Sequence, residues 1–355
     1  MMSPIIDELF TGVGARPPLI CVEMSGNHQG SLESALQFVR LAKEAGADLL
    51  KVQVYRPNTI TLDSDKEDFR LATDNDWASY ETLYKLYEKA HTPWSWVEAM
   101  FAEAQACDLP IFASPFDPTA VSFLESLACP IYKIASPEIT DHGLIEACAK
   151  TGKPVVLSTG LASLEDLNEA VAILRAHRAP HIILKCVSAY PTPIEVMNVT
   201  SIPWLQKRFS CQVGLSDHSL GPEASYAATA LGAVLIEKHF RLDDDDTSVD
   251  AAFSMPLGAL PELKKTIKAI FSSLGRPTLE VPTIARPSLS GRRSLYVTKE
   301  INPGEKITEE NVRSVRPCFG LHPKYLPKVV GRTVNQHLGV GDRLDWSAIE
   351  THESS

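Results

Sequence analysis

The 355-residue sequence lacks any long hydrophobic run, since no stretch approaches the roughly 18 consecutive apolar residues that a membrane-spanning helix needs. Its first ten residues contain no basic stretch followed by an apolar core, so no secretion signal is predicted. Its seven cysteines form no Cys-x-x-Cys pair, and they lie mostly within apolar segments. Together these absences favour a protein of the reducing cytoplasm with no membrane partner.

The sequence also lacks an excess of basic residues. Its formal net charge is −10, which argues against a general affinity for nucleic acid. A local cluster of lysines could still hold a small anion. The hydrophobic content of 44% is ample for a buried core, and the length allows one large domain plus a small one.

Eight short runs with strand character recur along the chain, and each is followed by a segment of helical periodicity. They are 19–27, 49–55, 110–117, 131–136, 154–161, 182–190, 211–219 and 235–242. Eight such units within about 260 residues predict an α/β fold of the (β/α)8 TIM-barrel type. We place the barrel at 19–275, after an N-terminal segment 1–18. An open doubly wound sheet is the alternative, because periodicity alone does not show closure.

The composition of the sequence changes after residue 274. The stretch from Gly275 to Gly291 is rich in Pro, Gly and Ser and lacks periodicity, which predicts a linker at 276–290. Beyond it, 291–355 reads as a compact module with a strand at 294–297 and a capped short helix at 308–311. Such a small unit buries little surface by itself, so we expect it to pack against the surface of a partner.

A long aromatic-rich excursion, 56–93, follows the second predicted strand. It contains Trp77, Tyr80, Tyr84 and Tyr87. Long loops at the carboxyl ends of barrel strands build substrate pockets, which is one interpretation. The alternative is that the three tyrosines form a helix face packed on the barrel, since their spacing is four and three.

Two histidines each follow another polar residue by two positions, Ser216 with His218 and Glu237 with His239. Strand side chains alternate between faces, so each pair would point the same way, and a barrel would bring the two strands side by side. Two imidazoles beside a carboxylate are plausible ligands of a divalent transition metal, which indicates a metal-assisted carbonyl reaction. Either histidine taken alone could be an ordinary core or surface side chain.

Lysines and hydroxyl groups also occur inside the predicted strands, where a parallel barrel normally has apolar residues. They include Lys51 with Gln53, then Lys133, Lys185, Ser136, Ser158, Ser188 and Ser216. A buried ionisable group costs several kcal/mol unless it is paired. Converging ammonium and hydroxyl donors would form a phosphate or carboxylate site. Any single lysine could instead be an internal strut paired with a nearby acid.

Several segments together resemble the sialic acid synthase family across nearly the whole chain. They are Glu23-Met24-Ser25-Gly26-Asn27-His28-Gln29-Gly30, Lys133-Ile134-Ala135-Ser136, Ser158-Thr159-Gly160, the run from Lys185 to Pro191, the run from Gly214 to Leu220, and Glu237-Lys238-His239-Phe240. The resemblance implies a (β/α)8 barrel joined to a small antifreeze-like (SAF, β-clip) domain. It also implies condensation of phosphoenolpyruvate with an N-acylated amino sugar, giving a nine-carbon 2-keto acid and phosphate.

Within that family, segments 83–87, 91–94, 114–117 and 320–326 look most like the branch that makes pseudaminic acid from 2,4-diacetamido-2,4,6-trideoxy-β-L-altropyranose. Synthesis of N-acetylneuraminate or legionaminate is the close alternative. A carbohydrate-binding protein without catalysis, and an aldolase that makes a shorter keto acid, fit the motifs less well. Thr247-Ser248-Val249, where this branch often has Gly-Gly, and Cys318, in place of a common glycine, depart from the family pattern.

Carried over residue by residue, the resemblance implies a role for each matching position. His218 and His239 would hold a divalent ion, Mn²⁺ first, with Co²⁺ or Mg²⁺ as alternatives. Glu23, Gln53 and Glu237 would form the catalytic set. The substrate-binding residues would be Lys51, Ser114, Lys133, Ser136, Ser158, Ser188, Tyr190, Ser216, Asp250 and Arg316. Arg316 would come from the small domain of the second chain in a homodimer, so that two chains share each active site.

Overall fold

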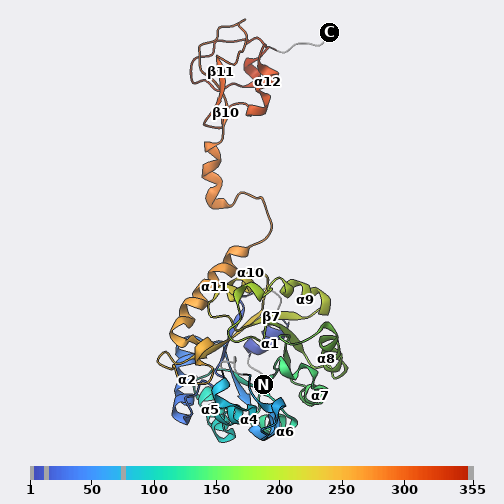
Figure 1. Cartoon of the computed structure of the whole chain (residues 1–355). Coiled ribbons are helices and arrows are strands. Elements are labelled where there is room, and N and C mark those ends of the chain that lie inside the picture. The colour runs from blue at the N-terminus through green and yellow to red at the C-terminus, as the bar shows by residue number, and fades with distance from the viewer. Residues whose placement is uncertain (1–3, 12–15, 73–76, 351–355) are drawn as a thin grey trace. The chain divides into compact units, whose positions relative to one another are not determined.

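The computed structural model describes residues 4–11, 16–72 and 77–350. The chain forms two compact units, Met1–Gly275 and Arg276–Ser355. Figure 1 shows the closed ring of strands and helices of the first unit and the small second unit near the C-terminus. Among the described residues, no helix is long and apolar enough to cross a membrane.

The first unit is a closed parallel barrel, as predicted. Its strands are β1 (Leu19–Glu23), β2 (Leu49–Val54), β3 (Ile111–Pro115), β4 (Tyr132–Ile134), β5 (Val155–Ser158), β6 (His181–Cys186), β7 (Gln212–Asp217) and β8 (Leu235–Arg241). Each strand pairs in parallel with the next, and β1 also pairs with β8 from Leu19↔Leu235 to Glu23↔His239. This last pairing rules out the open-sheet alternative. A two-residue strand, β9 (Met255–Pro256), pairs in parallel with the last residues of β8.

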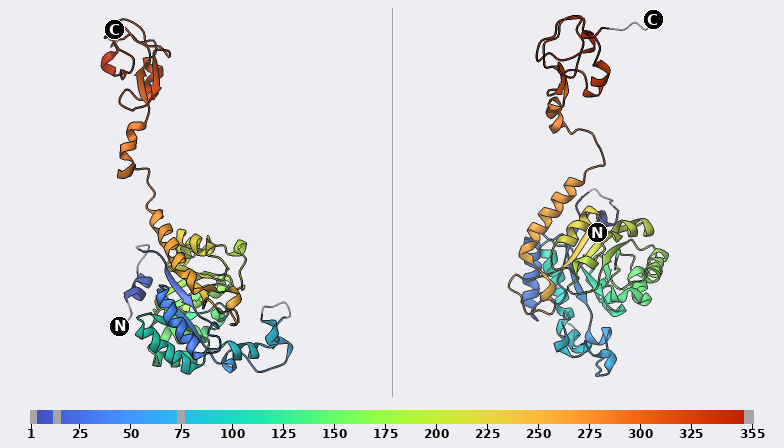
Figure 2. Two further views of the ribbon diagram at one scale, coloured as in Figure 1. Left: turned by 90° about the vertical axis from the view of Figure 1, so that its left-hand side faces the viewer. Right: turned by 45° about the horizontal axis from the view of Figure 1, so that its top comes forward.

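Helices surround the strands, as both views in Figure 2 show. They are α2 (Leu32–Glu44), α3 (Pro57–Ile60), α4 (Leu83–Ala90), α5 (Trp94–Ala106), α6 (Pro118–Ser126), α7 (His142–Lys150), α8 (Leu164–Ala176), α9 (Ser201–Phe209), α10 (Glu223–Ala230) and α11 (Leu260–Leu274). Short 3₁₀ helices are η1 (Glu67–Phe69), η2 (Ala78–Tyr80), η3 (Pro137–Thr140), η4 (Ile194–Val196), η5 (Ala251–Phe253) and η6 (Leu257–Ala259).

Local sequence explains where several of these helices begin. The side chains of Ser31, Asp117 and Asp141 accept hydrogen bonds from backbone N–H groups in the first turns of α2, α6 and α7. Ser163 and Asp166 form a reciprocal capping box at the start of α8. Each cap satisfies donors that a helix leaves unpaired at its amino end.

The amino-terminal segment contains a helix that the sequence analysis did not predict. Helix α1 (Pro4–Thr11) buries Ile6 and Leu9 in the same hydrophobic cluster as the barrel strands. Ile6 lines a hollow with Ile111, the first residue of β3, and Leu9 lines another with Val234, just before β8. The helix therefore lies at the end of the barrel where the strands begin.

The aromatic excursion is partly helical. Tyr84 and Tyr87 lie on α4, whereas Tyr80 lies in η2, so the single-helix interpretation holds only for 83–90. The ring of Tyr87 meets Tyr55, just after β2, with 5.7 Å between their centroids.

The second unit has its own core, built around Leu295, Val297 and Val312. Strand β10 (Ser294–Val297) pairs antiparallel with β11 (Val312–Val315), and η8 (Pro323–Tyr325), α12 (Leu326–Val329) and η9 (Trp346–Ala348) follow. One expectation was wrong here. Residues 308–311 form a turn closed by mutual Thr308–Asn311 hydrogen bonds, too short to continue as a helix. The predicted linker includes a 3₁₀ helix, η7 (Thr283–Gly291).

Candidate active site

The polar residues predicted within the strands converge at the carboxyl ends of the barrel strands. Glu23 lies beside Lys51 across β1 and β2, and beside His239 across β1 and β8. Gln53 lies beside Ser114, and Ser216 beside Glu237. Because these strands are parallel and closed into a ring, residues far apart in sequence reach one small volume.

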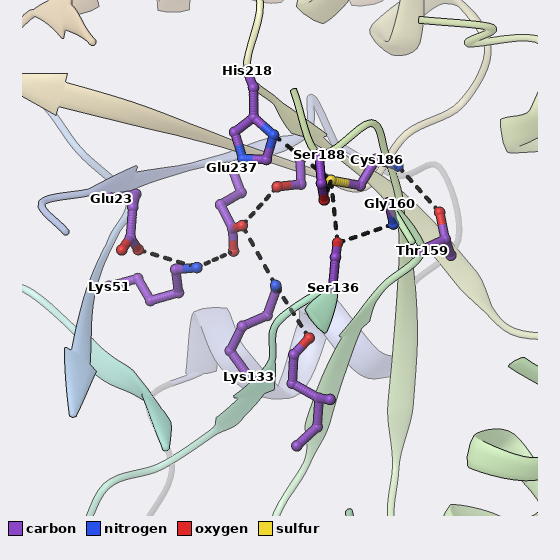
Figure 3. A network of polar contacts seen from close by, with 12 residues as sticks. Glu23, Lys51, Lys133, Ser136, Thr159, Gly160, Cys186, Ser188, His218 and Glu237 are labelled. Atoms are coloured by element: carbon purple, nitrogen blue, oxygen red, sulfur yellow. Dashed lines mark hydrogen bonds and ion pairs between the residues drawn. The ribbon is translucent and has the colours of Figure 1, made fainter. Parts of the chain in front are cut away.

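A buried ionic network occupies the centre of this volume (Figure 3). The Lys51 Nζ lies 3.1 Å from Glu23 Oε2 and 3.0 Å from Glu237 Oε2. The Lys133 Nζ lies 3.6 Å from Glu237 Oε1, which also accepts a 2.9 Å hydrogen bond from Ser216 Oγ. Lys51 and Lys133 are therefore paired with buried acids, as the alternative interpretation described. Both lysines are buried, and each ammonium group still has an N–H donor that could bind a ligand.

The two carboxylates of the network have opposite pKa shifts. Burial raises the pKa of Glu23, with the Lys51 ammonium group opposing that rise. Burial acts in the same direction on Glu237, but the ammonium groups of Lys133 and Lys51 outweigh it and lower its pKa. Two neighbouring acids with diverging pKa values are a common basis for separate acid and base roles.

Hydroxyl groups surround one side of the network. The Ser136 Oγ accepts a 3.0 Å hydrogen bond from Gly160 N and lies 3.5 Å from Cys186 Sγ, which in turn lies 3.9 Å from Ser188 Oγ. The hydroxyls of Ser114 and Ser158 are buried and have no hydrogen-bond partner within the described residues. Buried hydroxyls without partners require a ligand or water, so this side of the network fits a bound oxyanion.

Gly160 is essential to this arrangement, although its Ser-Thr-Gly context is only a weak sequence signal. A Cβ at this position would lie 2.2 Å from Ser188 Oγ, 2.7 Å from Ser136 Oγ and 2.9 Å from Cys186 Sγ. The glycine therefore lets the backbone N–H approach the hydroxyl group of Ser136. Only the three-dimensional fold reveals that this glycine and these serines meet.

The two predicted metal ligands lie together. The rings of His218 and His239 have centroids 5.3 Å apart, and His218 Nδ1 lies 2.9 Å from the carbonyl oxygen of Val187. The Nδ1 of His239 is buried without a hydrogen-bond partner in the described part of the chain, and burial keeps the pKa of this imidazole well below its usual value. A neutral, unpartnered imidazole beside a second one fits a divalent ion.

The protein would supply two ligands, His218 and His239, to such a metal site. No group of three or more His, Cys, Asp or Glu side chains within 4–11, 16–72 and 77–350 is arranged to hold a metal. A bound ion would therefore need water or substrate oxygens to complete its coordination, as an open catalytic site does.

A second side of the site is formed by Gln53, Tyr190 and Asp250. The Gln53 Nε2 donates to Glu23 Oε1 at 3.2 Å and to Ser25 Oγ at 2.8 Å. The Tyr190 ring meets His218 with centroids 4.4 Å apart. The Asp250 Oδ2 accepts a 3.1 Å hydrogen bond from Gly26 N, and burial raises its pKa.

The atypical Thr247-Ser248-Val249 loop is tied to its neighbours. The Ser248 Oγ accepts from Gln29 N at 3.1 Å, and the Val249 carbonyl accepts from Trp77 Nε1 at 3.0 Å. The loop after β8 is thereby joined both to the loop after β1 and to the long aromatic excursion.

The side chains of two further predicted participants make no hydrogen bond or ion pair with the ionic network within the described residues of their own units. Lys185 has no ion pair to the network, and its Nζ donates to the Cys186 carbonyl at 2.7 Å. Arg316 belongs to the second unit, where its side chain is exposed and no hydrogen bond or ion pair involves it among the described residues.

Two further residues near the network were missed by the sequence analysis. The Glu138 Oε2 in η3 is buried and unpartnered within the described residues, and burial raises the pKa of this carboxyl to about 7. Burial raises the pKa of the Cys186 thiol, but the His218 contact at 3.8 Å and its other polar neighbours outweigh burial and lower it to about 7. Their short distance from Ser136 and Ser188 in sequence was the available signal.

Comparison with known proteins places the chain among sugar-acid synthases. The NeuB family model matches residues 38–278, and the SAF domain model matches 292–350. The pseudaminic acid synthase of Campylobacter jejuni (strain 81-176) is 43% identical over 92% of this chain and 95% of its own length. The pseudaminic acid synthase of Helicobacter pylori (strain 26695) is 42% identical over 94% and 98%.

Among solved structures, the N-acetylneuraminic acid synthetase of Leptospira borgpetersenii, in complex with citrate, aligns with a TM-score of 0.67 and 31% identity. The alignment covers 77% of this chain and 90% of that one. The matching models span the barrel from within α2 onward and residues 292–350 of the second unit. The chain belongs to the NeuB family and carries a C-terminal SAF domain.

Proposed function

We propose that this protein condenses phosphoenolpyruvate with 2,4-diacetamido-2,4,6-trideoxy-β-L-altropyranose and water to give pseudaminic acid and phosphate. The observation that carries the proposal is a buried pair of lysines with unpartnered hydroxyls, lying beside two histidines at one end of the barrel. The higher identity to pseudaminic acid synthases than to the N-acetylneuraminic acid synthetase supports this sugar over the alternative.

In this proposal the phosphate group of phosphoenolpyruvate lies against Lys133 and the serines at positions 136, 158, 188 and 216. Lys51 and Ser114 would bind its carboxylate. Burial lowers the pKa of Lys133, and a bound phosphate dianion would raise this pKa again. The unpartnered hydroxyl groups would donate hydrogen bonds to the phosphate oxygens. Charge-assisted hydrogen bonds in a buried site are strong enough to orient the enol phosphate.

The aldehyde of the open-chain sugar would lie at His218 and His239. A divalent ion held there, with Mn²⁺ proposed first, would supply Lewis-acid polarisation of the aldehyde oxygen. Gln53, Tyr190 and Asp250 would position the rest of the sugar. Tyr190 is well suited to this because its ring already packs on His218.

Bond changes then follow from the chemistry of the two substrates. The C3 carbon of phosphoenolpyruvate forms a bond to the aldehyde carbon, and the aldehyde oxygen gains a proton. Water adds to C2 and gives up one proton. Collapse of this tetrahedral centre forms the C2 carbonyl and breaks the C2–O bond, and the second water proton goes to the leaving phosphate. Glu23 and Glu237 are the candidates for these proton transfers, since their pKa values are shifted in opposite directions.

We further propose that the working form is a cytoplasmic homodimer in which the SAF domain of one chain supplies Arg316 to the N-acyl group of the other chain's sugar. Arg316 is exposed and Phe319, three residues on, is 59% exposed. Exposed apolar side chains also follow adjacent barrel strands at the carboxyl end: Leu161 after β5, Ile194 after β6 and Leu220 after β7. All seven cysteines are free thiols, in keeping with a reducing compartment.

The test is phosphate release in the presence of phosphoenolpyruvate, Mn²⁺ and each candidate sugar. The proposal predicts rapid release with the altrose derivative and slower release with N-acetylmannosamine. Absence of release with every sugar would refute the synthase function, whereas a preference for N-acetylmannosamine would refute only the sugar. Mixing an Arg316→Ala chain with a chain inactivated in its barrel should restore part of the activity if sites are shared.

A further inference from the structure

An aromatic wall lies next to the histidine pair, formed by Trp77, Tyr190 and Phe253. The ring centroids are 5.8 Å apart for Trp77 and Tyr190, 6.1 Å for Trp77 and Phe253, and 5.1 Å for Tyr190 and Phe253. Phe253 also lies 5.2 Å from the ring of His239. Three loops far apart in the sequence therefore build one continuous surface that begins at the histidines.

The wall has a near end and a far end. Tyr190 and Phe253 pack against the histidine rings, whereas Trp77 packs against Tyr190 and Phe253. A sugar with its aldehyde at the histidines and its six-carbon chain along this wall would bring its far end to Trp77. Which groups the sugar carries at that far end distinguishes one acceptor from another.

The N–H group of the Trp77 indole is already used in a hydrogen bond within the protein. Its Nε1 donates at 3.0 Å to the carbonyl of Val249, in the loop after β8. With that donor used by the protein, Trp77 offers a ligand mainly apolar ring surface. Phe253 has no polar atom in its ring, and it is 3% exposed. Such surface favours a methyl group over a hydroxymethyl or phosphorylated one.

The groups around the aromatic wall also disfavour a phosphorylated sugar. Asp250 directly precedes the 3₁₀ helix Ala251–Phe253 and is buried with its carboxyl group on Gly26 N. The ring contacts of Tyr190 and Phe253 within residues 16–72 and 77–350 involve only aromatic and imidazole rings. A phosphate group on a sugar lying along this wall would meet apolar rings and, near Tyr190, the carboxyl group of Asp250.

We infer that Trp77, supported by Phe253, is a specificity-determining residue that selects acceptor sugars with a methyl group at C6. The inference rests on the proposed function and deepens it, because it assigns the choice of sugar to a part of the site separate from the lysines and serines. It also assigns a role to the atypical Thr247-Ser248-Val249 loop, because the Val249 carbonyl accepts the hydrogen bond of the Trp77 indole.

The experiment compares two acceptors that differ only at C6, namely the 2,4-diacetamido-2,4,6-trideoxy altrose and the same sugar with its 6-hydroxyl restored. Phosphate release gives kcat/KM for each. A single apolar group in a hydrophobic pocket changes kcat/KM by about 10- to 200-fold, so the unaltered enzyme should prefer the deoxy sugar by at least about tenfold. The Trp77→Ala variant should lose most of that preference while its KM for phosphoenolpyruvate stays unchanged.

Controls separate the outcomes. Trp77→Phe should keep the preference, and Trp204→Ala, which alters a tryptophan 51% exposed on α9, should change neither constant. Should Trp77→Ala unfold, Trp77→His retains a ring without its apolar surface and should lose the preference as well. A folded Trp77→Ala or Trp77→His variant with undiminished preference overturns the inference. An unaltered enzyme that releases no phosphate with either sugar refutes the proposed function instead.

Discussion

The two sides of the candidate site are built by opposite means. The side around Lys51 and Lys133 is held together by ion pairs between buried charges, all supplied by strands. The side around His218 and Trp77 is held by ring packing and single hydrogen bonds, supplied largely by loops. The strand-built side suits a substrate of fixed shape, and the loop-built side suits a substrate that varies between related enzymes.

Breaking the ionic side should have the largest effect. Lys51→Met would leave Glu23 and Glu237 facing each other without the ammonium group between them. Removing one partner of a buried charge group costs about 3–5 kcal/mol, so the free energy of unfolding should fall by that order. Urea unfolding followed by circular dichroism measures it.

A matched double variant sharpens this prediction. In Lys51→Met combined with Glu23→Gln, Glu237 retains Lys133 and Ser216 as partners. The double variant should therefore recover part of the lost stability, though no activity. Equal stability of the single and double variants would contradict the idea that unpaired charge is the source of the cost.

On the loop-built side, His239→Ala should abolish catalysis while the fold persists. The Nδ1 of His239 has no hydrogen-bond partner among the described residues, so the substitution removes ring packing but no hydrogen bond of this atom. If the imidazole helps to hold a Lewis-acidic ion, kcat/KM should fall by at least about 100-fold, and a chelator should inhibit the unaltered enzyme similarly. Full activity in the presence of the chelator would contradict a metal role.

The barrel and its polar centre could be predicted from the sequence because both follow local rules. Period-two alternation placed Glu237 with His239 on one face, and the repeated β/α pattern implied that Lys51 and Lys133 would meet them. The closure itself depends on the β1–β8 pairing, a contact between residues more than 200 positions apart, which no local pattern contains. The family resemblance, not periodicity, supplied the expectation for Arg316.

The unpredicted features are those that tertiary contacts decide. Gly160 is required because three side chains from the carboxyl ends of β4 and β6 surround it, and its own neighbours in sequence give no sign of this. The turn at 308–311 has the capping residues of a helix, yet the chain passes directly into β11. Trp77 could be recognised as aromatic, but its neighbours Tyr190 and Phe253 come from different loops.

The substitution Gly160→Ala should weaken the binding of phosphoenolpyruvate without weakening the binding of the sugar. The Cβ of Gly160→Ala would overlap the hydroxyls of Ser136 and Ser188, which would have to turn away from a bound phosphate. We expect KM for phosphoenolpyruvate to rise about 10- to 100-fold, as for the loss of one or two charge-assisted contacts, with KM for the sugar nearly unchanged. Gly152→Ala, at an exposed turn, controls for a general glycine effect on stability but not on KM.

The smallest predicted effect concerns pH and Glu138. Its pKa is raised by burial from 4.5 to about 7, so the folded state binds this proton more tightly than the unfolded state. The contribution to stability is complete below about pH 4.5 and is lost as the pH rises toward 7, with an upper bound of about 3 kcal/mol. Glu138→Gln, which carries no charge at any pH, should therefore stabilise the protein at pH 8 but not at pH 5. Melting temperatures of both proteins across this range measure the difference, and parallel curves would show that Glu138 gains a partner when it ionises.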